Sequence, residues 1–350
     1  MTKPKSRQRR WPATAVEAWR AFWFRPQPAY TLGLVRMAFG AVAIGWTASL
    51  LPDLYALFGP HGVEPQQPED AYQWGVFAMW TSDHALLIGW ILLLVSSVAL
   101  TIGWHSRLAG LAVFVLILSF EHRDVWVFNS GDLAVRIEAL FLAISPCGVA
   151  LSFDQVHSTG KFWSAQLRPQ WPVRLMQVQL SLIYLASAQA KLNGNAWPQG
   201  TAVSYALRLP DTLLLPTPHW FTTSALLMNA VTWGSLAVEL SIGILVWNRR
   251  LRPWVLAAGV VMHTMIMITI AVGFFTLAVF VLYLAFVPPE IVERLPRSAK
   301  DMARKLVARL ARPGPKSTNQ NENSDSTEDK GVVAEPRAES PSGARTTTED

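Results

Sequence analysis

Long apolar runs separated by short polar segments make up most of the chain between residues 30 and 288. Most of these runs approach the ~20 residues that a helix needs to cross the hydrocarbon core of a bilayer. The pattern therefore predicts an all-α fold: a polytopic integral membrane helix bundle with about eight transmembrane helices. The predicted spans are 30–51, 84–104, 107–122, 132–151, 173–191, 224–247, 253–271 and 274–288.

Three segments flank this apolar frame. Residues 1–29 are basic with scattered aromatic residues and lack the apolar stretch of a signal peptide, which predicts a cytoplasmic, interfacial segment. Residues 289–312 place apolar side chains at helical spacing among basic ones, which predicts an amphipathic helix on an anionic inner leaflet. Residues 313–350 are polar without an aromatic residue, and we expect a disordered tail there.

The distribution of charge predicts the orientation in the membrane. Hydrophobic residues are 51% of the chain and charged residues 15%, with a net charge of +6. If the N-terminus is cytoplasmic, the inside segments hold 25 of the 30 Lys and Arg residues and the outside segments only three. This asymmetry predicts the cell (inner) membrane as location, with both termini cytoplasmic. The expected partner is thus the lipid bilayer, and no nucleic acid is expected.

Several kinds of site are absent from the sequence. Cys147 is the single cysteine, which excludes an internal disulfide and a CxxC redox pair. The seven histidines include no pair at i, i+3 or i+4, so we predict no metal site. Phosphate-loop, dinucleotide, HExxH and nucleophile-elbow motifs are also missing.

The predicted fifth span carries a polar stripe. At 100° per residue, one narrow face of this helix holds Gln177, Ser181, Tyr184, Ala188 and Lys191. Lys191 lies at the outer end of this stripe. Two interpretations are open: the ammonium extends to the lipid headgroups, or a desolvated, neutral amine lines an outward-facing pocket and acts as a general base.

Under the second interpretation, further residues become candidates for the site. Lys191 would be the catalytic base, and the candidate substrate-binding residues would be Gln177, Ser181, Tyr184 and Trp197. Trp197, just beyond the span, is either a wall of this pocket or an aromatic residue of the membrane interface.

Ionisable residues also fall near the middles of other spans, where facing lipid would be costly. Glu239 and His263 are the candidate catalytic relay: they either hydrogen-bond to each other and hold two helices together, or relay protons to the cavity of Lys191. Arg136 and Glu138 are two positions apart, so on a helix they point to different sides and do not neutralise each other.

Sequence blocks in a fixed order suggest a family. The most specific is AKL-x4-W-x2-G, from Ala190 to Gly200. The others are VRMAFGAV (35–42), LFGPHGVEP (57–65), GWHSRLAG (103–110), EHRDVWVFNSGDLAVR (121–136), ISPCGVALSFD (144–154), AVELSIGILVWNRRLRP (237–253) and the His263 span followed by Phe274 and Phe275. Over residues 30–288 the chain resembles the HTTM (horizontally transferred transmembrane) proteins, bacterial relatives of vitamin K-dependent γ-carboxylase.

The resemblance implies a chemistry. In the γ-carboxylases the lysine of the AKL element is thought to deprotonate reduced vitamin K, so Lys191 would be the matching base, and a quinone or reduced vitamin K-like quinol the implied cofactor. Two departures are visible. The carboxylases continue into a large luminal domain, where this chain has its polar tail, and they carry a histidine in an Asn-rich element where this chain reads Asn129-Ser130-Gly131-Asp132.

Two functions from different classes therefore remain open. One is a γ-carboxylase-like membrane enzyme (a lyase or quinol-oxidising enzyme) that acts on a lipophilic, quinol-like substrate with Lys191 as general base. The other is a non-catalytic membrane protein: an immunity, maturation or scaffold protein that serves a membrane or extracytoplasmic partner, or a small carrier.

Overall fold

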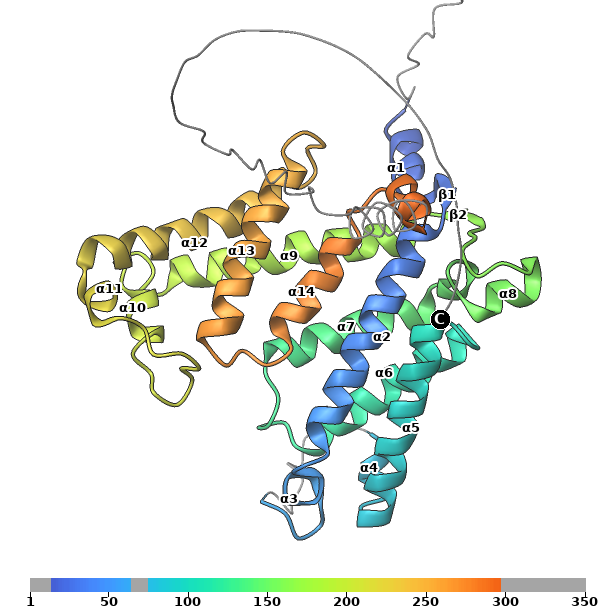
Figure 1. Cartoon of the computed structure of the whole chain (residues 1–350), viewed down its shortest axis with the longest axis horizontal. Helices are drawn as coiled ribbons and strands as arrows, with labels where there is room; N and C mark the ends of the chain where they lie inside the picture. Colours follow the sequence, from blue (N-terminus) through green and yellow to red (C-terminus); the bar gives the residue numbers. More distant parts are fainter. Residues whose placement is uncertain (1–13, 64–74, 297–350) are drawn as a thin grey trace, which may run out of the picture. The chain divides into compact units, whose positions relative to one another are not determined.

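The computed structural model describes residues 14–63 and 75–296 (Figure 1). Each of the eight apolar runs forms a helix, and the predicted helical class is confirmed. The eight helices are α2 (Tyr30–Leu50), α5 (Asp83–Ile102), α6 (Ser106–Arg123), α7 (Ser130–Ile144), α9 (Trp171–Asn193), α12 (Ala225–Leu245), α13 (Arg252–Thr269) and α14 (Phe275–Leu284).

Shorter elements connect these helices. They are α1 (Ala15–Phe24), α3 (Leu54–Phe58), α4 (Val76–Met79), the 3-10 turn η1 (Cys147–Val149), α8 (Phe153–Thr159), α10 (Ala202–Ala206) and α11 (His219–Thr223). Two short strands, β1 (Pro26–Pro28) and β2 (Leu167–Pro169), pair antiparallel. This pairing joins the segment before α2 to the segment before α9.

Membrane crossing is supported for part of the helices. Among the described residues, α2, α5, α12 and α13 are long and apolar enough to cross a membrane, and α14 is a fifth if it is joined to Pro289–Pro296 across a bend of 96°. The predicted number of eight is not confirmed. With its 15 residues, α7 is short for a straight crossing. Helix α6 carries three charged residues and, in addition, His122. The polar stripe makes α9 less apolar than the other long helices.

Some predicted segments extend beyond the described residues. The predicted amphipathic helix at 289–312 is described only as far as residue 296, and the predicted tail at 313–350 lies outside the described part. Only residues 14–29 of the predicted interfacial segment are described, and they contain α1 and β1.

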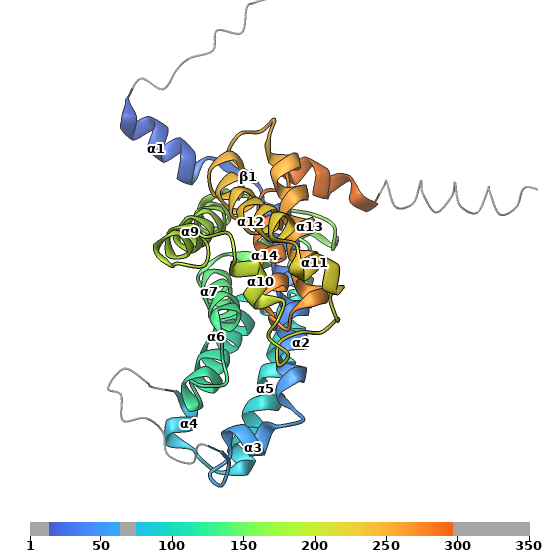
Figure 2. The ribbon, with the colours of Figure 1, turned by 90° about the vertical axis from the view of Figure 1, so that its left-hand side faces the viewer.

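The helices pack in two groups that α14 joins. In the first group, α2 contacts α5 and α7, and α6 lies between α5 and α7. In the second group, α12 lies beside both α9 and α13 (Figures 1 and 2). Because α14 contacts α2 and α7 as well as α9 and α13, it connects the groups.

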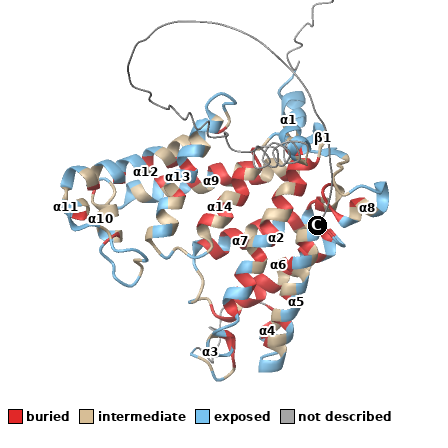
Figure 3. Ribbon diagram, viewed as in Figure 1, coloured by how far each residue is buried: buried red, intermediate tan, exposed pale blue. Residues whose placement is uncertain are grey.

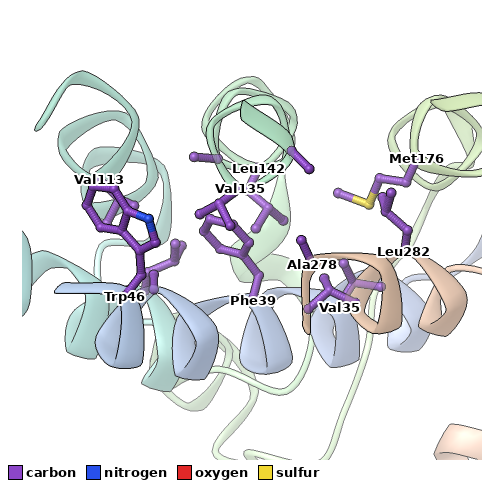
Figure 4. Close-up of a cluster of buried hydrophobic side chains, with 14 of the residues drawn as sticks. Val35, Phe39, Trp46, Val113, Val135, Leu142, Met176, Ala278 and Leu282 are labelled. Atoms are coloured by element: carbon purple, nitrogen blue, oxygen red, sulfur yellow. The ribbon is translucent and has the colours of Figure 1, made fainter. Parts of the chain in front are cut away.

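The buried side chains concentrate where these helices meet (Figure 3). The centre of this core contains Val35, Phe39 and Trp46 of α2, Val113 of α6, Val135 and Leu142 of α7, Met176 of α9, and Ala278 and Leu282 of α14 (Figure 4). Inside a bilayer, helices associate through close packing and hydrogen bonds, because lipid tails are as apolar as the side chains. Gly40 shows this closeness: a Cβ there would lie 2.2 Å from Oγ1 of Thr101 on α5.

Polar contacts organise the turn between α5 and α6. Asp154, at the start of α8, accepts hydrogen bonds from the backbone N–H of His105 (2.8 Å) and from the backbone N–H (2.9 Å) and hydroxyl (2.7 Å) of Ser106. Partial burial disfavours its charged form, but the hydrogen bonds from Ser106 and His105 outweigh burial. The pKa of Asp154 therefore lies below its ordinary value of 3.8.

The Asp154→Asn variant tests this contact. An amide keeps the shape but loses the charge that accepts three hydrogen bonds, so we expect a loss of about 1 kcal/mol in the free energy of unfolding at neutral pH. The lowered pKa means that the wild-type contribution is complete above pH 3.8 and disappears as the pH falls through the folded-state value.

Thermal unfolding in detergent at several pH values measures this difference. The gap between wild type and variant should be widest at neutral pH and shrink below pH 3.8. A gap that is the same at every pH would contradict a charge-based contribution.

Candidate functional site

The polar stripe of α9 lies on the packed face of the helix. Pro172, in the first turn, suits a helix start because its missing N–H would have no intrahelical acceptor there. Gln177, Ser181, Tyr184 and Ala188, which the periodicity places on one face, are all buried. The stripe therefore faces other helices along most of its length.

The side chains in the N-terminal part of the stripe form hydrogen bonds within the protein. Gln177 donates to the carbonyl of Ala285 (2.7 Å) and accepts from Arg174 (2.8 Å). Ser181 accepts from the indole N–H of Trp247 (2.9 Å). By helix geometry Gln177 lies about 21 Å and Ser181 about 15 Å from Lys191 along the axis. The structure does not bring these two predicted substrate-binding residues to Lys191.

At the C-terminal end of α9, Lys191 contacts two groups, the carboxylate of Glu239 and the indole of Trp197. Its ammonium forms an ion pair with Glu239 of α12, and the hydroxyl of Ser187 donates to the other oxygen of that carboxylate (3.3 Å). The amine also lies 4.4 Å from the ring centroid of Trp197, a distance typical of a cation–π contact. The side chain of Lys191 is 22% exposed and that of Glu239 is 8% exposed. The structure thus brings Lys191, Glu239 and Trp197 together.

Two turns deeper, Tyr184 connects three helices. Its hydroxyl is 2.7 Å from Nε2 of His263 on α13 and hydrogen-bonds to the hydroxyl of Tyr283 on α14. His263 is 1% exposed, and its ring is 5.6 Å from the ring of Phe275. Within the described residues, Nδ1 of His263 has no hydrogen-bond partner.

The partners of Glu239 and His263 differ from the predicted pairing. Instead of a bond between the two, Glu239 pairs with Lys191 and His263 pairs with Tyr184. Both residues nevertheless bind a residue of the α9 stripe, so the structure places them on either side of one helix face.

Tyr283 belongs to this group, and the sequence analysis did not identify it. Its hydroxyl reaches Tyr184 because α13 has Gly259 at the contact: a Cβ there would lie 2.3 Å from that hydroxyl. One feature of the sequence could have identified Tyr283: it is the one tyrosine in the apolar run 274–288. A buried tyrosine hydroxyl usually has a hydrogen-bond partner.

These contacts define what the site can do chemically. Lys191 and Glu239 have opposite charges, and pairing lowers the cost of holding ionisable groups at membrane depth. Such a pair can hold or exchange one proton, and Tyr184, His263 and Tyr283 form a hydrogen-bonded chain beneath it. No group of three His, Cys, Asp or Glu side chains suited to a metal ion occurs among the described residues.

A second ion pair joins α6 and α7. Arg136 lies 2.7 Å from Glu121 and 3.4 Å from His122. Arg136 therefore does not neutralise Glu138, as the helical spacing predicted.

Comparisons with known proteins place this structure in a family. A family model described as the HTTM domain matches residues 24–290, a range that includes all eight long helices. No curated protein and no solved structure matches the chain. The match agrees with the AKL element around Lys191 and with the apolar helices. The chain therefore belongs to the HTTM family, and it is a membrane protein of that family.

Proposed function

We propose that this protein is an integral membrane enzyme that removes a proton from a lipophilic, quinol-like substrate, with Lys191 as the base. The observation that carries the proposal is the arrangement at the outer end of α9. There an amine, a carboxylate and an indole face meet at the end of a stripe that is otherwise buried.

The ion pair supplies a route to a reactive amine. The pair of Lys191 and Glu239 is neutral overall both as ammonium with carboxylate and as amine with carboxylic acid. Burial penalises separated charges, so a lipophilic ligand that excludes water favours the second form. Lys191 then accepts the proton of the ligand hydroxyl: the O–H bond breaks, an N–H bond forms, and the ammonium stabilises the resulting anion.

The neighbouring residues suit an aromatic ligand that carries oxygen atoms. Trp197 offers an indole face beside the amine. Nδ1 of His263, which has no hydrogen-bond partner in the described part of the chain, lies near the rings of Phe275 and Tyr184. Bound, a quinol would supply reducing equivalents to the reaction. The γ-carboxylase-like chemistry rests on the resemblance around Lys191.

We further propose eight membrane crossings in a bacterial inner membrane, with both termini cytoplasmic. Contacts between loops support this topology, because they bring predicted inside segments together with one another and predicted outer parts of the chain together with one another. The pairing of β1 with β2 and the bonds from His105 and Ser106 to Asp154 gather the predicted inside segments. The bridge between Leu213 and Ile270 joins the predicted outside segment before residue 224 to the predicted outer end of the span 253–271.

A non-catalytic role is the second candidate. The pair of Lys191 and Glu239 and the bond between Tyr184 and His263 link α9 to α12 and α13, as structural contacts would. In that case the protein is an immunity, maturation or scaffold protein for a membrane or extracytoplasmic partner, or a small carrier, and Lys191 only holds helices together.

Variants at Lys191 test the base. We expect Lys191→Ala to slow the air oxidation of a bound naphthoquinol, which needs the ionised quinol, by about 10²–10⁴-fold. Lys191→Arg should be equally slow, because a guanidinium stays protonated.

Absorbance of the quinone product gives the rate, and mass spectrometry of co-purified lipid gives the bound quinone. The exposed neighbour Leu192→Ala is the matched control. Quinol oxidation by Lys191→Ala at the wild-type rate would contradict the proposal.

Exchanging the two charges separates a base from a structural contact. The double variant Lys191→Glu with Glu239→Lys keeps an ion pair between α9 and α12 but moves the amine to α12. We expect its melting temperature to recover toward wild type, relative to Lys191→Glu alone, while quinol oxidation stays at the level of Lys191→Ala. If activity returned together with stability, the pair would be structural.

Cysteine labelling tests the proposed topology. Cys147→Ser removes the single, buried cysteine, so new cysteines can be placed at two exposed positions, Val63 and Lys161. In intact spheroplasts, a membrane-impermeant maleimide should label Val63→Cys but label Lys161→Cys only after lysis. The opposite result would invert the proposed orientation.

A further inference from the structure

A carboxyl group without a partner lies in the middle of α7. Glu138 is 1% exposed, and within the described residues neither of its carboxyl oxygens has a hydrogen-bond partner. The buried residues nearest to it along α7 are the apolar Ala134, Val135, Ala139 and Leu142. The one cation on its own helix is Arg136, which pairs with Glu121, so α7 supplies Glu138 with neither a free cation nor a hydrogen-bond donor.

The helices packed against α7 supply no cation either. These helices are α2, α6, α9 and α14. Their cationic groups have other places or partners: Arg36 donates to the carbonyl of Leu151, Arg107 is exposed at the start of α6, Arg123 donates to the carbonyl of Gly59, Arg174 bonds to Gln177, Lys191 pairs with Glu239, and His122 contacts Arg136.

The remaining titratable groups on these helices and on α7 are anionic or neutral. Glu121 is paired with Arg136, Asp132 accepts from Trp46, Tyr184 and Tyr283 bond to each other, and Tyr30 is the first residue of α2. None of them carries a positive charge for Glu138.

An ionised carboxylate in this position would be expensive. Removing one ion from water without a compensating partner costs several kcal/mol, and a surrounding membrane adds to that cost. A protonated carboxyl carries no charge, so its burial costs much less. We propose that Glu138 holds a proton at neutral pH and is a membrane-embedded proton-binding site, separate from the pair of Lys191 and Glu239.

This site has a reactivity that distinguishes it from a carboxylate. A lipophilic carbodiimide, such as dicyclohexylcarbodiimide, reacts with a protonated carboxyl in an apolar environment. The acid proton goes to one nitrogen of the reagent, the carboxyl oxygen bonds to the central carbon, and the acyl group then moves to nitrogen. Every atom of both reactants stays in the adduct, so no further reactant is needed.

Infrared spectroscopy of the full-length protein in liposomes at neutral pH tests the proposal. Compared with wild type, Glu138→Gln should lose a carbonyl stretch of a protonated carboxylic acid and no carboxylate band. Asp154→Asn is the matched control because three hydrogen bonds from His105 and Ser106 stabilise its carboxylate, so this variant should lose a carboxylate band. Loss of a carboxylate band in Glu138→Gln would overturn the proposal.

Labelling of the wild type covers the case in which Glu138→Gln does not fold. After treatment with dicyclohexylcarbodiimide, peptide mass spectrometry should find the adduct on Glu138 and not on Asp154, whose carboxylate accepts three hydrogen bonds. Adducts confined to other carboxyl groups would overturn the proposal. Neither measurement involves quinol oxidation, so the result is independent of the function proposed for Lys191.

Discussion

Every charged group at membrane depth needs a partner inside the protein, and at the candidate site the ion pair of Lys191 and Glu239 meets this requirement. Lipid tails offer neither hydrogen bonds nor hydration, so an unpaired charge there is costly. The pair joins α9 to α12, and the bonds of Tyr184 join α9 to α13 and α14. The same contacts therefore hold these helices together and shape the site, so a mutation that changes the helix packing also changes the geometry of the site.

Much of the fold follows from local pattern, and the partners of the site residues do not. Each apolar run became a helix, because helix formation satisfies all backbone groups of a segment within that segment. The 100° repeat identified the face of α9 that is buried, since rotation about one helix axis depends only on that helix. The partner of Glu239 depends on the rotation and packing of two helices, and no pattern within α12 contains that information. Tyr283 was missed for the same reason: its role appears only where α14 meets α9 beside Gly259.

Three buried carboxyl groups show how the same side chain differs with its surroundings. Glu121 faces a guanidinium, Glu239 faces an amine and a hydroxyl, and Glu138 faces neither a cation nor a donor within the described residues. The cation beside the first is permanently charged, whereas the second can exchange a proton with its partner. The third is most stable as a neutral acid. Sequence alone does not give the partners of these residues, because each is one glutamate in an apolar run.

Comparison of the two ion pairs explains why Lys191 is the candidate base. The side chains of Arg136 and Glu121 are 24% and 6% exposed, and those of Lys191 and Glu239 are 22% and 8% exposed, so burial does not distinguish the pairs. The cation does, because a guanidinium keeps its proton in proteins and an amine can lose it. Without a bound ligand, Glu239 and Trp197 both stabilise the ammonium form of Lys191. The neutral amine therefore has to form when a ligand excludes water from the pair. A base of this kind would be inactive until its lipophilic substrate is bound, so the proton transfer depends on the exclusion of water by that substrate.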